Sequence, residues 1–306
     1  DHRDLHSFPT RRSSDLMLAG ILTNPDARQG RGLTLAPSPV AEAAARICPE
    51  IPVLKPEKLD AAARNEVSAL RPDILAVFAY GKIFGPKFLG LFGDAVNVHP
   101  SLLPRWRGPA PIAFALLNRD EQTGLTVQRV AQKLDSGDLL HQTVWNLAFD
   151  ETTADLTERA STEGAEALVS VLKLMDTGPL AGTAQDEAQA TWSRLLSKDD
   201  GIIDWNKPAL VLDAEIRAFN PWPLSRTEAG GKILFAHGSC PVVGPESGLA
   251  PGTIISIDKQ AGIMVQTGKG ILALTSLQWA GKKLVSMQEF MNGSRLAAGT
   301  RCGVPV

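Results

Sequence analysis

The sequence from Met17 to about Gly178 alternates short apolar runs with amphipathic stretches, and this alternation constrains the fold most strongly. Such a pattern is typical of repeated βαβ units, in which helices cover a largely parallel sheet. Within it, the run from Ile74 to Ala79 contains no polar residue. Because a parallel strand covered on both faces has a continuous apolar sequence, we predict a central strand there. The first part of the chain is therefore expected to be α/β.

Individual elements follow from the length and period of the apolar segments. After a first apolar run, the predicted strands are Ile51–Leu54, Ile74–Ala79, Ala95–Val98, Thr126–Val130 and Leu139–Leu147. The predicted helices are Val40–Ile47, Ala61–Leu70 and Pro111–Leu117. Thr152 and Asp155 have the spacing of a capping box, so a long helix with one apolar stripe should follow.

The composition changes after Gly178 and Pro179, which are expected to end that helix. The next residues are small and polar and suggest a linker. Beyond a helix near Leu210 to Phe219, short segments separated by Gly and Pro predict a small antiparallel barrel. We therefore predict a leader at 1–16, an α/β domain at 17–180, a linker at 181–198 and a β-barrel domain at 199–306.

Residues 1–16 show neither helical nor strand periodicity and mix charged residues with serine and one proline. Two interpretations stay open for them: a disordered leader, or foreign sequence joined to a shortened gene. Either interpretation removes the segment from the predicted fold.

Charge and cysteine content limit the classes of function. The formal net charge is −2, which is not the basic balance of a protein that binds nucleic acid over its whole surface. From Ser197 onward the charge is +2, which suits either an RNA-facing domain or an ordinary solvated surface. The three cysteines are far apart and lack metal-ligand spacing. With no apolar run of about 20 residues, we expect a cytoplasmic protein with no membrane partner.

Polar residues suited to catalysis follow the predicted strand Ala95–Val98. Asn97 and His99 are two apart, so on an extended backbone both side chains point to the same side. Sites in open parallel sheets lie beyond the carboxyl ends of the strands. An amide donor and an imidazole suit a transfer that passes through a tetrahedral intermediate. Asp135, in the turn Leu134–Asp138, is the carboxylate that we expect to orient His99.

The segment from Asn97 to Pro111 resembles the signature of the folate-dependent formyltransferases, Asn-x-His-x-Ser-Leu-Leu-Pro followed by a basic Trp-Arg-Gly segment. The resemblance implies that Asn97, His99 and Asp135 form the catalytic trio. It implies a folate site at Ser101, Leu102, Leu103 and Pro104, with the pteridine pocket lined by Phe78, Tyr80, Gly81 and Ile83. The implied fold is a Rossmann-like domain with a mainly parallel sheet, followed by a small OB-like β-barrel domain.

Further segments resemble methionyl-tRNA formyltransferases and extend the likeness from about Met17 to Gly303. Leu196–Trp205 and Ile216–Pro223 look like the start of the second domain in that family. An early loop resembles the one that enters the tRNA acceptor end, so Arg28 and Arg31 are expected to bind tRNA. The implied reaction moves a formyl group from 10-formyltetrahydrofolate to the amino group of methionyl initiator tRNA. The resemblance also implies a monomer without a metal.

Family members open with a strand and a helix before the equivalent of Met17, and we expect that this first βα unit is absent here. Neighbouring strands would then lack a partner. Two alternative functions stay open. One is a formyltransferase acting on an amino sugar nucleotide or on glycinamide ribonucleotide, although the arginine loop and the second domain favour tRNA. The other is an inactive, truncated relic that binds folate or RNA.

Overall fold

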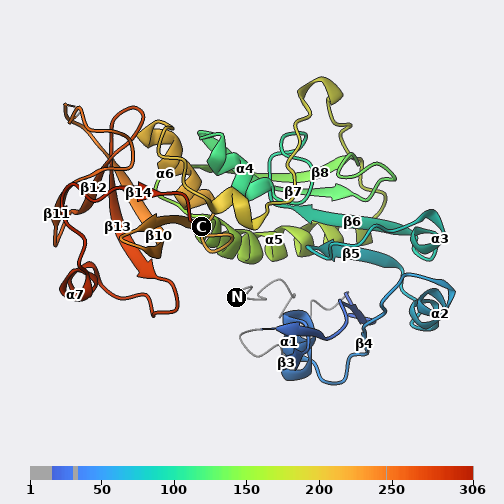
Figure 1. Cartoon of the computed structure of the whole chain (residues 1–306). Coiled ribbons are helices and arrows are strands. Elements are labelled where there is room, and N and C mark those ends of the chain that lie inside the picture. Colours follow the sequence, from blue (N-terminus) through green and yellow to red (C-terminus); the bar gives the residue numbers. More distant parts are fainter. Residues whose placement is uncertain (1–15, 30–33, 246, 306) are drawn as a thin grey trace. The chain divides into compact units, whose positions relative to one another are not determined.

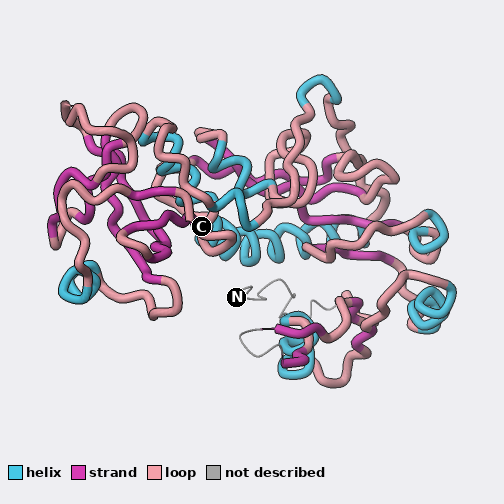
Figure 2. Tube along the Cα trace, in the orientation of Figure 1, coloured by secondary structure: helices cyan, strands magenta, loops and turns pink. Residues whose placement is uncertain are grey.

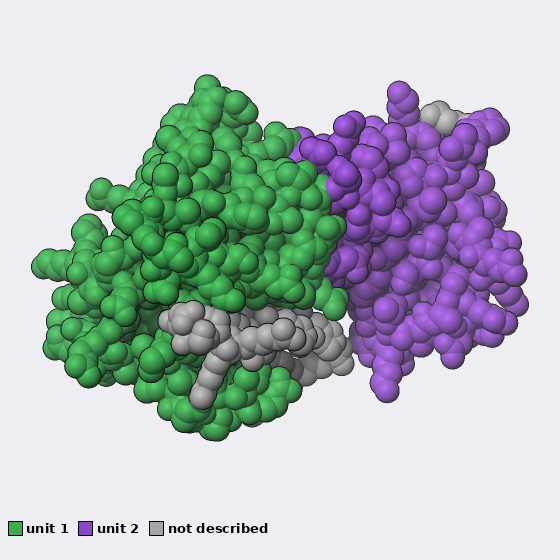
Figure 3. Space-filling view, turned by 180° about the vertical axis from the view of Figure 1, so that it is seen from behind, with its two compact units in different colours: residues 1–111, 123–145, 157–193 green, residues 112–122, 146–156, 194–306 purple. Residues whose placement is uncertain are grey.

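The computed structural model describes residues 16–29, 34–245 and 247–305 (Figure 1). The predicted leader therefore lies, apart from its last residue, outside the described residues, and so does Arg31. The chain divides into two compact units, coloured separately in Figure 3. Unit 1 contains the described residues up to Pro111, together with Thr123–Trp145 and Thr157–Ser193. Unit 2 contains Ile112–Gln122, Asn146–Leu156 and the residues from Arg194 onward.

Unit 1 is built on a four-stranded sheet with the order β5-β6-β7-β8 (Figure 1). The strands are β5 (Ile74–Phe78), β6 (Asp94–His99), β7 (Gln122–Arg129) and β8 (Leu139–Asn146). β5 and β6 run parallel, whereas β6 and β7 run antiparallel, so the sheet is mixed. The predicted α/β class is confirmed.

The predicted central position of the run from Ile74 to Ala79 is wrong. In the part of the chain that the structure describes, β5 pairs with β6 alone and forms an edge of the four-stranded sheet. Val77 is buried, but Ala76 is exposed. Hydrophobicity reflects burial of the strand faces, whereas the position of a strand in the sheet depends on backbone hydrogen bonds along its edges. The apolar pattern therefore did not determine where β5 lies.

The region before β5 contains short elements, including a hairpin that the sequence did not suggest. These are β1 (Ile21–Leu22), β2 (Ala27–Gln29), β3 (Thr34–Ala36), α1 (Pro39–Ile47), β4 (Val53–Leu54) and α2 (Ala61–Ala69). β1 and β4 form a parallel pair separate from the four-stranded sheet. Ser38 and Asp60 cap the two helices by accepting hydrogen bonds from amides of the first turn, so both helices begin near their predicted starts.

The helices that follow agree with the sequence pattern. α4 (Pro111–Leu117) has its predicted bounds, and α5 (Thr153–Asp176) is the predicted long helix, whereas the single turn α3 (Pro86–Leu89) was not predicted. The capping box at its start is confirmed, because the Thr152 amide donates to the Asp155 carboxylate at 2.8 Å and the Asp155 amide donates to the Thr152 hydroxyl at 3.3 Å. The predicted apolar stripe is buried at Leu156, Ala160, Leu168 and Val171.

Unit 2 contains a six-stranded antiparallel sheet with the order β11-β12-β13-β10-β9-β14, whose strands are magenta in Figure 2. One 3₁₀ turn, Glu187–Gln189, lies in unit 1, and a second, Lys198–Gly201, lies in unit 2. The elements of unit 2 that follow are α6 (Ala209–Ala218), β9 (Ser225–Ala229), β10 (Lys232–Val242), β11 (Ile254–Asp258), β12 (Gly262–Gln266), β13 (Ile271–Trp279), α7 (Met287–Gly293) and β14 (Cys302–Gly303).

The two edges of this sheet meet. Thr253, next to β11, forms an antiparallel bridge with Arg301, next to β14, and the Cys302 amide donates to the Gly252 carbonyl at 2.7 Å. The sheet therefore curls toward closure, and the predicted small antiparallel barrel is confirmed. Its interior is apolar, with α6 contributing the fully buried Leu212 and Ile216.

Candidate active site

β6 carries the two polar residues that the sequence analysis singled out. Asn97 lies opposite Gln128 of β7, and His99 lies opposite Thr126. Alternate residues of a strand share a face, and directly opposed residues of an antiparallel pair lie side by side on one face. Asn97, His99 and Gln128 therefore lie on the same face of the sheet, as predicted for the first two. The Asn97 side chain is half-buried, whereas His99 is buried with 5% of its surface exposed.

The structure brings His99 and Asp135 together. His99 Nδ1 lies 3.7 Å from Asp135 Oδ2, and His99 Nε2 lies 2.9 Å from the carbonyl oxygen of Trp106. A carbonyl can only accept, so Nε2 carries a hydrogen and the neutral ring has its lone pair on Nδ1. A second proton would therefore arrive on the nitrogen that faces the carboxylate.

Burial and the neighbouring oxygens act in opposite directions on this histidine. Burial lowers the pKa of His99 from its ordinary value of 6.5, while the Asp135 carboxylate and the Trp106 carbonyl act to raise it. Burial is the largest of these effects, so the neutral ring predominates at neutral pH. A neutral imidazole with a carboxylate beside its lone pair is suited to receive a proton during a reaction.

Asp135 is fixed from two sides. Its Oδ2 accepts from the Gly108 amide at 2.8 Å, and its Oδ1 accepts from Gln128 Nε2 at 3.3 Å. The residue lies in the turn between β7 and β8 with a positive φ of 50°, a conformation in which Asp is better tolerated than most residues. The sequence identified this turn, but its two hydrogen-bond donors come from elsewhere in the chain.

Gly137, two residues later, requires the absence of a side chain. A Cβ atom there would lie 1.8 Å from the Arg129 carbonyl oxygen, so the backbone of β7 or of the turn would have to move. We expect Gly137→Ala to lower the free energy of unfolding by about 1–3 kcal/mol, measured by urea denaturation. Gly244→Ala is the control, because a Cβ there meets no atom of the described residues within 4 Å. Equal stabilities of the two variants would contradict the close approach.

The predicted folate residues Ser101 to Pro104 begin two positions after His99. Ser101 and Leu103 are buried, and the Ser101 hydroxyl donates to the Arg105 carbonyl at 2.6 Å. Their side chains therefore hold the shape of the turn. Leu102 and Pro104 are half-buried and retain surface that a ligand can contact.

The second predicted folate segment, Phe78 to Ile83, leaves the carboxyl end of β5. Phe78 pairs in parallel with Val98, so this loop starts at the same end of the sheet as His99. Tyr80 stacks on Phe84 with ring centroids 5.4 Å apart, and its hydroxyl is buried without a hydrogen-bond partner among the described residues. Gly81 is exposed with φ 76°, and Ile83 is 84% exposed. Apolar surface and an unpaired hydroxyl therefore lie in this loop.

Of the two predicted tRNA-binding arginines, Arg28 alone lies among the described residues. Arg28 is exposed on β2, opposite Leu35 of β3. Arg31 falls between these strands and outside the described residues.

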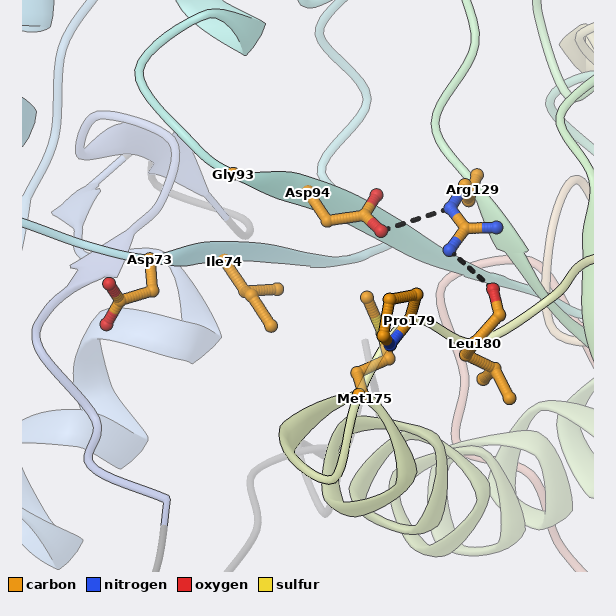
Figure 4. Close-up of a pocket in the computed structure, with 9 residues that line it drawn as sticks. Asp73, Ile74, Gly93, Asp94, Arg129, Met175, Pro179 and Leu180 are labelled. Atoms are coloured by element: carbon orange, nitrogen blue, oxygen red, sulfur yellow. Dashed lines mark hydrogen bonds and ion pairs between the residues drawn. The ribbon is translucent and has the colours of Figure 1, made fainter.

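A cavity of about 340 Å³ lies at the other end of the sheet (Figure 4). It is lined by the starts of β5 and β6, where Arg129 binds Asp94 at 3.0 Å and donates to the Leu180 carbonyl at 2.8 Å. β6 runs from Asp94 at this cavity to His99 at the candidate site. The cavity therefore belongs to the amino ends of the strands and not to the His99 site.

Two features are absent from the described residues. No cluster of three or more His, Cys, Asp or Glu side chains arranged to hold a metal occurs among them. Within the same part of the chain, no helix combines the length and apolar character needed to span a membrane.

Three polar residues at this site were missed by the sequence analysis. Gln128, Arg107 and Gln185 form a buried or half-buried network around the Asp135 turn. Gln128 could have been found, since it directly opposes Asn97 once the strand register is known. Gln185 gave no signal, because it lies in a segment of small and polar residues that was interpreted as a linker.

Comparison with known proteins agrees with this geometry. The profile of the family described as Formyl transferase matches residues 5–172, and that of its C-terminal domain matches residues 195–295. The chain therefore belongs to the formyl transferase family, and the predicted resemblance is confirmed.

Two similar relatives carry the name methionyl-tRNA formyltransferase. The methionyl-tRNA formyltransferase of Treponema pallidum subsp. pallidum is 44% identical over 301 residues, which cover 94% of this chain and 92% of the relative. The methionyl-tRNA formyltransferase of Roseiflexus sp. is 41% identical over 288 residues, covering 94% of this chain and 87% of the relative.

Solved structures share the fold at lower identity. HypX from Aquifex aeolicus matches with a TM-score of 0.62 and 16% identity over 89% of this chain and 48% of its own, so the chain spans about half of HypX. WlaRD, a sugar 3N-formyl transferase, matches with a TM-score of 0.60 and 13% identity over 86% of this chain and 88% of its own. The methionyl-tRNA formyltransferase from Clostridium thermocellum matches with a TM-score of 0.52 and 16% identity over 67% of this chain and 88% of its own. These likenesses concern the fold alone.

Proposed function

We propose that this protein transfers a formyl group from 10-formyltetrahydrofolate to the amino group of methionine on the initiator tRNA. The relatives named methionyl-tRNA formyltransferase support this, since 44% identity extends over 94% of the chain. The structural observation that carries the proposal is the contact of His99 with Asp135 at the carboxyl end of β6, the strand that also presents Asn97. Ligand sites in α/β sheets form at such strand ends.

Each of the three residues has a distinct task in the proposed reaction. Attack of the methionine nitrogen on the formyl carbon produces an oxyanion, which the Asn97 amide stabilises by donating a hydrogen bond. The attacking nitrogen loses a proton, which Nδ1 of neutral His99 accepts, and Asp135 stabilises the resulting imidazolium. Collapse of the intermediate breaks the bond to the folate nitrogen, which takes the proton from the His99 imidazolium as it leaves, so the neutral ring is restored.

The folate is the formyl donor in this proposal. The half-buried Leu102 and Pro104, with the apolar loop from Phe78 to Ile83, offer a surface for a flat heteroaromatic ring at the same end of the sheet as His99. The Tyr80 hydroxyl, which lacks a partner among the described residues, is available to hydrogen bond with it. HypX from Aquifex aeolicus, which shares the fold, was solved in complex with tetrahydrofolic acid.

The tRNA is the formyl acceptor. Arg28 is exposed on the β2–β3 hairpin, and we propose that it and Arg31 contact the phosphates or bases of the acceptor end. The net positive charge of the sequence from Ser197 onward favours the same polyanionic partner.

The direct test is formyl transfer from 10-formyltetrahydrofolate to methionyl initiator tRNA, with uncharged tRNA and an amino sugar nucleotide as alternative acceptors. Transfer that requires the aminoacyl group supports the proposal. Transfer only to the sugar nucleotide would replace it with the alternative sugar specificity. A folded protein that transfers the group to neither acceptor would support the inactive relic.

The proposed role of His99 predicts a pH dependence. Only the neutral ring accepts a proton, and burial keeps the pKa of His99 below 6.5, so the rate should rise with pH through an inflection below that value. Asp135→Asn removes a charge that raises this pKa, so the inflection should move to lower pH. Single-turnover formylation by both proteins measures the shift, since the substrate amine titrates equally in each. An inflection that stays in place would contradict the electrostatic pairing.

We further propose that the enzyme acts in the cytoplasm as a monomer. Cys48, Cys240 and Cys302 are all free thiols, as is usual in a reducing compartment. Light scattering coupled to size exclusion tests the monomer, which has a mass of 32.7 kDa.

A further inference from the structure

The segment from Thr183 to Ser193, named here the bracing segment, is hydrogen-bonded at both ends to other parts of unit 1. At its start Thr183 and Leu139 exchange backbone hydrogen bonds of 2.8 and 2.9 Å. At its end the Ser193 amide donates to the Arg107 carbonyl at 2.7 Å. The first contact is to β8, just after the Asp135 turn, and the second is to the loop after β6. The bracing segment therefore connects the two loops that hold His99 and Asp135 in place.

The side chain of Gln185 joins the same two loops. Its Oε1 accepts from Arg107 Nε at 3.1 Å and from Arg107 Nη2 at 2.8 Å. Its Nε2 donates to the carbonyls of Asp135 at 2.9 Å and Gly137 at 2.7 Å, and it lies 3.2 Å from Gln128 Oε1. Arginine only donates and backbone carbonyls only accept, so the orientation of this amide is fixed.

A second connection runs in parallel through Glu187. Its two carboxylate oxygens bind Arg107 Nη2 and Lys133 Nζ, each at 2.6 Å. Lys133 precedes Asp135 by two residues and lies in the same connection between β7 and β8. These two cations hold the pKa of Glu187 down at about 2. Arg107 itself is completely buried, which makes it a rigid attachment point.

The two loops each supply contacts to the His99–Asp135 pair. The loop after β6 provides the Trp106 carbonyl to His99 and the Gly108 amide to Asp135, while the β7–β8 turn carries Asp135 itself. We propose that Gln185 is a positioning residue, which locks the Asp135 turn to Arg107 and so keeps the carboxylate beside the imidazole. This inference rests on the proposed formyl transfer. Gln185 would act on that reaction indirectly, by holding Asp135 beside His99.

Gln185→Met and Gln185→Glu separate the two halves of the contact. Methionine has a similar length and loses both halves. Glutamate keeps an acceptor for Arg107 but cannot donate to the carbonyls of Asp135 and Gly137. A small displacement of a reacting group typically costs about 10- to 10²-fold in rate. We expect both variants to lose about this much kcat, with KM for both substrates near the wild-type value. Gln189→Met is the control, since the side chain of this exposed residue bonds to Asp186 alone among the described residues.

The pH profile distinguishes positioning from simple anchoring of the bracing segment. If Asp135 moves away from His99, the inflection in Gln185→Met should shift to lower pH, in the direction expected for Asp135→Asn. A Gln185→Glu variant with wild-type kcat, or an unshifted inflection in both variants, would overturn the proposal. Should Gln185→Met fail to fold, Gln185→Glu alone decides. Wild-type protein is assayed in parallel. An inactive wild type refutes the proposed function and with it this role of Gln185, whereas an active wild type makes the loss or retention of rate in the variants decisive for Gln185 alone.

Discussion

Replacing His99 with alanine is expected to lower kcat for formyl transfer by about 10²–10⁴, the usual contribution of a positioned acid–base group. The loss should fall mainly on kcat, because the ring is buried and its two nitrogens face Asp135 and the Trp106 carbonyl rather than a broad binding surface. Single-turnover rates with saturating folate and methionyl-tRNA measure this step without interference from product release.

His141→Ala is the matched control for that variant. His141 is an exposed histidine of β8 in the same unit, and within the described part of the chain its Nε2 bonds to the Thr143 hydroxyl alone, at 3.1 Å. It should retain the wild-type rate. Because removal of a buried ring also leaves a cavity, the thermal midpoint of His99→Ala is measured on the same preparation. A folded His99→Ala protein that transfers formyl groups at the wild-type rate would remove His99 from the proposed chemistry.

The sequence predicted local elements best where a local signal exists. The capping box at Thr152 and Asp155 and the bounds of α4 agree with the structure. The spacing of Asn97 and His99 predicted a shared face, because the side-chain period of a strand does not depend on tertiary contacts. Asp135 was chosen as the partner of His99 from its position in a turn, and the family resemblance supported that choice. The spacing of the residues could not show their proximity, since the two are joined only when β6, β7 and the turn are assembled.

Features that depend on distant partners could not be predicted. β5 has the sequence of a central strand, yet its edge position depends on hydrogen bonds that its side chains do not specify. The bracing segment has the composition of a linker, and its fixed structure comes from Arg107 and Lys133, more than 50 residues earlier. A short polar segment has no hydrophobic periodicity. Its sequence therefore does not distinguish a solvated linker from a segment whose polar groups are hydrogen-bonded to a neighbouring loop.

Asn97→Asp is expected to lower kcat by about 10²–10³ or more, since loss of one oxyanion donor typically costs that much. The substitution keeps the size of the side chain but replaces the donor by a carboxylate, which repels the developing negative charge. Asn97→Ala lacks the donor without adding a charge, and a water molecule can partly replace the amide. The expected order of rates is therefore wild type, then Asn97→Ala, then Asn97→Asp.

Asn146→Asp is the isosteric control, because Asn146 is exposed on β8 and its side-chain oxygen accepts a hydrogen bond from Gln122 at 2.8 Å. An aspartate oxygen can accept the same hydrogen bond. It should transfer formyl groups at the wild-type rate. The order of the two Asn97 variants separates oxyanion stabilisation from a packing role, because a packing role predicts that the isosteric aspartate is the milder change. If Asn97→Asp proves faster than Asn97→Ala, the amide does not donate to the transition state, and the oxyanion must be stabilised by a group other than Asn97.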